Sequence, residues 1–181
     1  MRYGVDFMNE EKLICELLDS VDKEYLDIVK PILEHNEFIK RKEYHHHEDE
    51  SVYYHSLCVS IFAYKFAKKY NLNYKDAAIG GLLHDFYYKD WQTNNIKVKN
   101  IFKKHGFVHA SEAVENSYRY FPELMNDRVE NIIKRHMFPL NITPPRFKES
   151  WVVTMADKRC SISVLKHPLS WPKYLGIKKK V

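Results

Sequence analysis

Apolar residues recur at the spacing of an amphipathic helix along most of this chain, and this periodicity is its strongest structural constraint. Apolar positions lie three and four residues apart within residues 51–70, and the same spacing returns within 126–136 and 148–164. Only five Gly and seven Pro occur among 181 residues, which argues against a turn-rich all-β protein. The sequence therefore predicts an all-α bundle with short connections.

Capping residues and breaks in the apolar pattern set the expected helix boundaries. Two short helices precede residue 34, and the later helices are expected to cover residues 51–70, 74–86, 111–121, 126–136 and 148–164. The polar stretches 34–50 and 90–106 are predicted to be loops. Gly80 and Gly81 lie inside an apolar helix, where Gly is unfavourable, so we expect a neighbouring helix to pass close to them.

The composition is that of one globular domain with a short basic C-terminal tail. Apolar residues make up 45% of the chain and charged residues 29%. The formal net charge of +5 favours an anionic partner but is too small to argue for nucleic-acid binding. The three Cys are scattered, and the sequence has neither a leader-like apolar stretch nor about 18 consecutive apolar residues. We therefore expect a cytoplasmic protein without a membrane span.

Six ionisable residues lie at the ends of, or within, strongly apolar helical segments. They are His55, His84, Asp85, His109, His136 and Asp157. An ionisable side chain in or beside a core must be paired or bound to a metal. A single histidine in such a place is more often a hydrogen-bonded structural residue than a ligand. The whole set, in this order, favours a metal centre.

Four imidazoles and two carboxylates can hold two six-coordinate divalent ions and leave positions for water. These ligands suit iron, manganese, zinc or nickel better than calcium, and magnesium is also a candidate. A carboxylate can bridge two ions, and two ions about 3.5–4 Å apart can clamp a phosphoryl group. The alternative is a single ion held by four of the residues, namely His55, His84, Asp85 and Asp157.

The same residues resemble the signature of the HD-domain superfamily of metal-dependent phosphohydrolases. The matching stretches are Tyr54-His55-Ser56, Gly80-Gly81-Leu82-Leu83-His84-Asp85, Ile133-Lys134-Arg135-His136 and Ala156-Asp157-Lys158. The resemblance implies an all-α HD-domain helical bundle, with residues 1–181 forming one domain whose core covers about 51–165. The chain looks most similar to small stand-alone bacterial members, which include a group that cleaves diadenosine tetraphosphate.

The resemblance also implies roles for individual residues. The family's core signature, with the two extra histidines of its two-metal subfamilies, maps onto His55, His84, Asp85, His109, His136 and Asp157. Asp85 would bridge an ion held by His55 and Asp157 to a second ion held by His109 and His136, which makes Asp85 the candidate catalytic residue. His109 is preferred to His105 as a ligand because Ala113 follows His109 at the spacing found in those subfamilies.

Four further residues are candidate substrate contacts: His47, His105, Arg135 and Lys158. His47 lies eight residues before His55 on a polar stretch that could fold over the site, although such a stretch also suits a solvated loop. Arg135 and Lys158 each adjoin an expected ligand and could neutralise a phosphate oxygen. A solvated helix face is the alternative for both.

The sequence therefore predicts a phosphoric ester or anhydride hydrolase in which a metal-bound hydroxide attacks the phosphorus of a nucleotide or dinucleotide. The expected partner is a small phosphorylated substrate, rather than nucleic acid or a membrane, with the oligomeric state left open. Two alternatives remain. One is a one-metal nucleotidase, and the other is a catalytically silent HD module that binds a nucleotide or nucleic acid for regulation.

Overall fold

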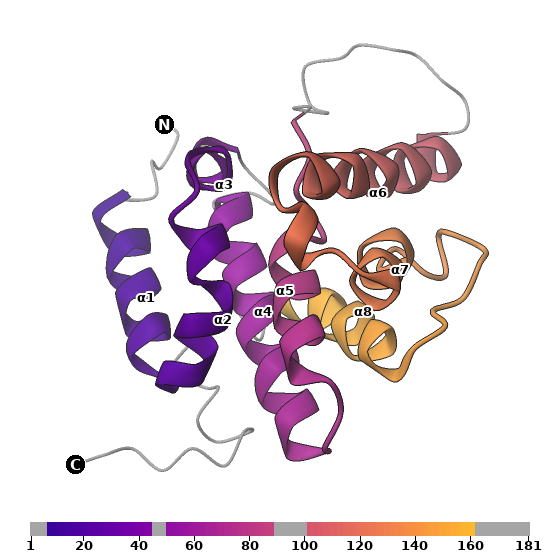
Figure 1. Cartoon of the computed structure of the whole chain (residues 1–181). Coiled ribbons are helices and arrows are strands. Elements are labelled where there is room, and N and C mark those ends of the chain that lie inside the picture. Colours follow the sequence, from indigo (N-terminus) through magenta and orange to yellow (C-terminus); the bar gives the residue numbers. More distant parts are fainter. Residues whose placement is uncertain (1–6, 45–49, 89–100, 162–181) are drawn as a thin grey trace.

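The computed structural model describes residues 7–44, 50–88 and 101–161, apart from the side chains of 7–9 and 101–108 (Figure 1). This part contains eight α-helices, two 3-10 helices and no β-strand, so the prediction of an all-α fold is confirmed. In chain order the elements are α1 (Phe7–Asp19), α2 (Lys23–Leu33), α3 (Asn36–Ile39), η1 (Lys40–Glu43), α4 (Val52–Lys69), α5 (Tyr74–Leu83), α6 (Ile101–Tyr120), η2 (Pro122–Leu124), α7 (Asp127–Arg135) and α8 (Lys148–Ser161). None of the helices described combines the length and apolar character that a membrane span requires.

Short polar side chains explain where the central helices begin. At four helix starts, a side-chain oxygen accepts a hydrogen bond from a backbone N–H of the first turn: Asp22 for α2, Ser51 for α4, Asn73 for α5 and Asn126 for α7. Because these caps are visible in the sequence, α4, α5 and α7 begin within one residue of their expected positions.

Two of the loop predictions are partly wrong. The stretch 34–50 contains α3 and η1, which are too short to produce a helical stripe in the sequence. Helix α6 begins at Ile101 rather than at residue 111, so His109 lies within this helix and not ahead of it. Gly106 concealed this extension, because one Gly weakens a helix by about 1 kcal/mol relative to Ala without necessarily ending it.

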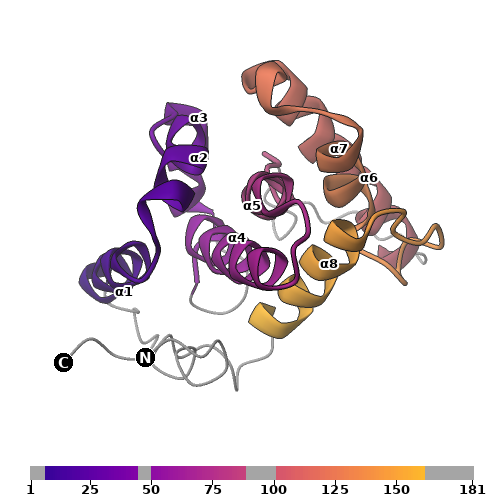
Figure 2. The ribbon, with the colours of Figure 1, turned by 60° about the horizontal axis from the view of Figure 1, so that its bottom comes forward.

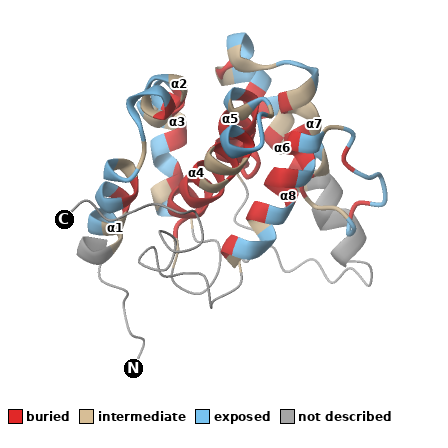
Figure 3. Ribbon diagram, turned by 90° about the horizontal axis from the view of Figure 1, so that it is seen from below, coloured by how far each residue is buried: buried red, intermediate tan, exposed pale blue. Residues whose placement is uncertain are grey.

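The core surrounds α5, which packs against α2, α4, α7 and α8. Figure 2 shows α5 lying between α2 on one side and α7 and α8 on the other. Its residues from Asp76 to Leu83 are all buried, as Figure 3 shows for the centre of the bundle. A buried chain of hydrogen bonds joins three of these helices: the Tyr25 hydroxyl donates to Ser60 Oγ over 2.9 Å, and Ser60 Oγ donates to the Ala78 carbonyl over 2.7 Å.

Gly80 and Gly81 allow two helices to approach α5 more closely than any other residue would. A Cβ at Gly80 would lie 2.6 Å from Ile132 Cγ2 on α7. A Cβ at Gly81 would lie 2.7 Å from Ser60 Cα on α4, which is backbone and cannot move without its helix. The expectation of a close neighbour is confirmed, and it holds on both sides of α5.

A cluster of four polar side chains joins the starts of α5, α7 and α8. Asp76 accepts hydrogen bonds from Asn126 Nδ2 at 3.2 Å and from Arg128 Nη1 at 2.6 Å, and Arg128 Nε lies 3.4 Å from Glu149 Oε2. Asp76 and Glu149 are buried carboxylates, so the single guanidinium of Arg128 compensates both. We refer to Asp76, Asn126, Arg128 and Glu149 as the Arg128 cluster.

Replacing Gly81 by Ala is expected to lower the free energy of unfolding by about 1–3 kcal/mol, because α5 must move away from the α4 backbone. Helix propensity alone would act in the opposite direction, since Ala favours a helix over Gly. Urea denaturation measures the change. An unchanged or increased stability would contradict the close contact.

Replacing Arg128 by Met is expected to lower the free energy of unfolding by about 2–3 kcal/mol, because it leaves two buried carboxylates without a cation. The matched control is Lys134→Met, which removes an exposed ion pair with Glu130 and should change stability by less than about 1 kcal/mol. Equal losses in the two variants would show that the cluster stabilises the fold no more than a surface pair.

Candidate metal centre

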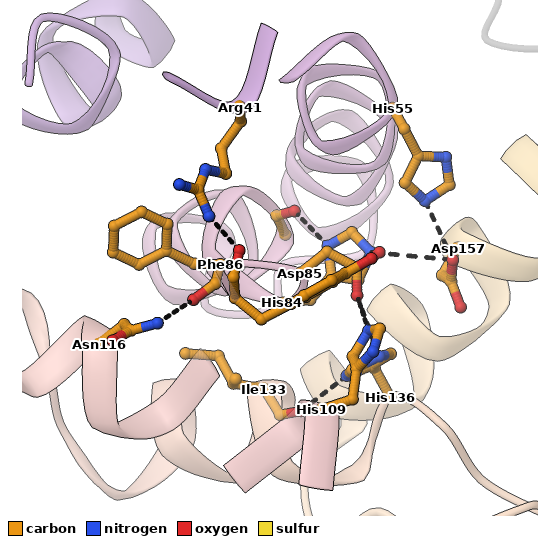
Figure 4. Close-up of polar contacts among 12 residues, drawn as sticks. Arg41, His55, His84, Asp85, Phe86, His109, Asn116, Ile133, His136 and Asp157 are labelled. Atoms are coloured by element: carbon orange, nitrogen blue, oxygen red, sulfur yellow. Dashed lines mark hydrogen bonds and ion pairs between the residues drawn. The ribbon is translucent and has the colours of Figure 1, made fainter. Parts of the chain in front are cut away.

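The structure brings the six predicted ligand residues into one place (Figure 4). His55 comes from α4, His84 and Asp85 follow α5, His109 comes from α6, His136 follows α7, and Asp157 comes from α8. Four of the six side chains are buried, and those of His109 and Asp157 are partly buried. Five separate parts of the chain therefore converge on a site that is largely closed to water.

Three of these residues lie at the same spacing along the chain from the Arg128 cluster. His84, His136 and Asp157 each lie eight residues after the member of the Arg128 cluster on the same helix. Eight residues of α-helix span about 12 Å. The side chains at the starts of these three segments lie close together, and so do those at their ends. Their common starting point therefore sets the level at which the three side chains arrive.

The six residues form two groups of three, and within each group the ligand atoms lie within 4.8 Å of one another. The first group consists of His55, His84 and Asp157, and the second group of Asp85, His109 and His136. In the first group, Asp157 Oδ1 lies 3.1 Å from His55 Nε2 and 3.7 Å from His84 Nε2. One carboxylate oxygen thus faces two imidazole nitrogens.

Asp85 connects the second group to the first. Its Oδ1 lies 2.8 Å from His109 Nε2 and 3.5 Å from His136 Nε2, both in the second group. Its Oδ2 lies 3.4 Å from Nε2 of His84, which belongs to the first group. The carboxylate therefore faces one group with each oxygen, which is the placement that a bridging ligand needs.

Backbone carbonyls determine which nitrogen of two imidazoles faces the site. His84 Nδ1 lies 2.8 Å from the Gly81 carbonyl oxygen, and His136 Nδ1 lies 2.7 Å from that of Ile133. A carbonyl oxygen only accepts, so Nδ1 carries the proton and donates in both residues. Nε2 of each is then left with a lone pair in the neutral ring. Both Nε2 atoms are buried and make no hydrogen bond within the described part.

The charges within the site reinforce one another. Burial favours the neutral form of Asp85 and Asp157, but the surrounding imidazoles outweigh it and hold the pKa of both carboxyl groups well below the usual range. Burial also lowers the pKa of His84, yet the carboxylates of Asp85 and Asp157 raise it to about 9. Two carboxylates facing imidazole lone pairs therefore require a cation between them, either a proton or a metal ion.

The donor set fits a divalent metal ion. The nitrogen atoms facing the site are Nε2 in all four histidines, and carboxylate oxygens face them from two aspartates. The two buried Nε2 atoms without hydrogen bonds are aimed at this space, with their rings already held by backbone carbonyls. Metal-bound histidines are typically oriented in this way by a hydrogen bond from the other ring nitrogen.

The structure describes the four residues expected to contact substrate less fully than the six ligand residues. Arg135, the last residue of α7, is partly exposed beside His136. Lys158 is exposed beside Asp157, and its ammonium group donates a hydrogen bond to the carbonyl of Phe138. His105 lies on α6 one turn before His109, but its side chain lies outside the described part, as does the whole of His47.

Two residues near the site escaped sequence reasoning. Arg41 on η1 donates a hydrogen bond to the Tyr87 carbonyl, and Asn116 Nδ2 on α6 donates to the Phe86 carbonyl over 2.9 Å (Figure 4). Both therefore hold the backbone that directly follows Asp85. Arg41 stands between two lysines, a pattern typical of a solvated surface, so no signal distinguished it.

The raised pKa of His84 predicts a pH dependence of the metal-free protein. Protonation of His84 favours the folded state fully below the ordinary histidine pKa of about 6.5, and this contribution is lost as the pH rises through about 9. The free energy of unfolding, measured with urea and a chelator, should thus fall by about 1–3 kcal/mol between these pH values. The fall should be smaller in His84→Gln. Identical profiles for the two proteins would contradict the assigned environment.

Comparison with known families agrees with this geometry. The chain matches the family model described as the HD domain over residues 52–162, which is more than half of its length and includes all six converging residues. Searches among curated proteins and among solved structures gave no significant match. The extent of the family match, together with the all-α fold, shows that this chain belongs to the HD-domain family.

Proposed function

We propose that this protein is a metal-dependent phosphohydrolase that cleaves a phosphate ester or anhydride. The observation that carries the proposal is the position of Asp85, whose two carboxylate oxygens face different groups of imidazole nitrogens. Two adjacent divalent ions require a bridging ligand of this kind. The HD-domain family includes metal-dependent phosphohydrolases, which supports the same conclusion.

In the proposed site each group of three residues holds one divalent ion, and Asp85 is shared between the two. Such a pair of ions, when bound, lowers the pKa of a water molecule and neutralises charge on a phosphoryl group. The protein supplies orientation and exclusion of solvent. The carbonyls of Gly81 and Ile133 prevent the rings of His84 and His136 from turning, because a flipped ring would lose its hydrogen bond.

The proposed substrate is a nucleotide or dinucleotide. The net charge of +5 favours an anionic ligand, and Arg135 and Lys158 adjoin residues of the two groups. The Lys158 ammonium has three N–H donors and gives one to the Phe138 carbonyl, so others can approach a phosphoryl oxygen. We propose that these two side chains hold the phosphate groups beside the ions.

Replacing Asp85 by Asn is the sharpest test of the proposal, because the amide keeps the shape of the carboxylate and removes its charge. Metal analysis of protein purified without chelators should find two ions per chain in the wild type and one or none in the variant. Phosphate release from nucleotides and dinucleotides, screened with Mn²⁺, Fe²⁺, Mg²⁺ and Ni²⁺, should fall by at least about 100-fold. The matched control is Asp127→Asn on the exposed face of α7, which should keep both ions and the activity.

The outcomes separate the alternatives. Full activity of Asp85→Asn would overturn the bridging role. One ion per wild-type chain with preserved hydrolysis would indicate a one-metal nucleotidase. Two ions without hydrolysis of any tested nucleotide would indicate a silent binding module. A crystal loaded with Mn²⁺ should give two anomalous peaks about 3.5–4 Å apart.

A further inference from the structure

We propose that Arg41 is a positioning residue that holds the second group in place through Tyr87. The inference deepens the proposed function and rests on it, since it concerns how one of the two proposed ions is held. Arg41 itself faces neither group. Its effect is transmitted by the short segment that follows Asp85 and by the Tyr87 ring.

The environment of Arg41 is unusual for a cation. Its side chain is 0% exposed, and in the described part of the chain no carboxylate pairs with it. The guanidinium carbon lies 4.2 Å from the ring centroid of Tyr44, 4.6 Å from that of Tyr88 and 5.5 Å from that of Phe86. Nε and Nη2 make no hydrogen bond with the described residues, so burying this charge is costly. A methionine would fill the same space at lower cost, which points to a role other than stability.

Among the described residues, the guanidinium donates its hydrogen bond to the backbone that follows Asp85. Helix α5 ends at Leu83, so the carbonyls of Phe86 and Tyr87 have no partners in a helix. Asn116 donates to the first of these carbonyls and Arg41 to the second, from α6 and η1 respectively (Figure 4). Side chains from distant parts of the sequence therefore fix two consecutive peptides immediately after Asp85.

The fixed segment carries the ring that supports His109. The centroids of the Tyr87 and His109 rings lie 3.9 Å apart, and the rings are inclined by 37°. Tyr87 is buried, and His109 Nε2 lies 2.8 Å from Asp85 Oδ1. Asp85, Tyr87 and His109 thus form a closed loop of contacts, and Arg41 holds this loop through its hydrogen bond to the Tyr87 carbonyl. The residues of the first group take no part in this loop.

The test is the full chain with Arg41→Met, titrated with Mn²⁺ by calorimetry. The second ion is expected to bind at least about tenfold more weakly, while the first keeps its affinity. Tyr87→Leu should reproduce this selective loss, and Tyr87→Phe should not. Because Arg41 acts through the Tyr87 ring, the double variant Arg41→Met/Tyr87→Leu should lose little more than either single variant. Additive losses, or equal weakening of both ions, would overturn the proposal.

Arg128→Met serves as the matched control, because it too removes a guanidinium. The Arg128 guanidinium compensates the buried carboxylates of Asp76 and Glu149 and lies in the Arg128 cluster, away from Tyr87. It should destabilise the fold without weakening the second ion selectively. If Arg41→Met does not fold, Arg41→Lys and Tyr87→Leu provide the same comparison, since Lys keeps the charge and one donor but lacks the planar fork.

A measurement without metal separates this inference from the proposed function. In metal-free protein with labelled histidine, the NMR signals of the His109 ring should carry the ring-current shift of Tyr87. This shift should decrease in Arg41→Met and stay unchanged in Arg128→Met. Failure of the wild type to bind two ions, with this shift behaving as expected, would reject the proposed function alone. An unchanged shift in Arg41→Met would reject the role of Arg41.

Discussion

The close approach of α5 to α4 and α7 is the constraint on which the candidate metal centre depends. Gly80 and Gly81 leave no room for a side chain on either face, and the two helices fill the space. His84 and Asp85 follow this contact directly, whereas His55 and His136 come from the two helices that make it. A gap of even one methyl group at the glycines would separate ligand atoms that now lie within a few ångströms. The geometry of the site therefore depends directly on how closely these helices pack.

The site residues that could be predicted from the sequence are those whose burial follows from the apolar pattern of the neighbouring residues. His84 and His136 follow helices that have recognisable caps at their starts and apolar residues near their ends, so their burial follows from the sequence pattern. The separation of His109 and His136 from His55 and Asp157 was expected from the sequence, whereas the place of His84 in the first group depends on how the segments cross, which no local pattern shows. The burial of Arg41 could not be predicted either. Its burial results from aromatic rings at Tyr44 and Tyr88, one of which lies 47 residues away in the sequence.

The position of His109 illustrates a different limit. The sequence placed this residue ahead of a helix, and the structure places it within α6. Its role as a member of the second group did not depend on that boundary, because residues on either side of a helix start lie close together in space. An error in the start of a helix is therefore compatible with the same set of converging side chains.

Helices α5 and α7 both end at the site, so their peptide dipoles direct partial negative charge towards it. Together with the carboxylates of Asp85 and Asp157, this makes the interior of the bundle attractive to cations at one end. At the opposite end the buried carboxylates of Asp76 and Glu149 lie near helix starts, where the dipoles favour negative charge. The direction of these helices thus suits the charged groups at both ends.

The equal spacing between the Arg128 cluster and the site has a consequence for how this chain can vary in length. One residue inserted into any of the three intervals would turn the following side chain by about 100° and advance it by about 1.5 Å, which is enough to remove a ligand atom from its partners. The connection between α7 and α8 carries no such restriction, because it joins the end of one interval to the start of the next. Insertions and deletions are therefore expected to be tolerated in such connections and not within the three helical intervals.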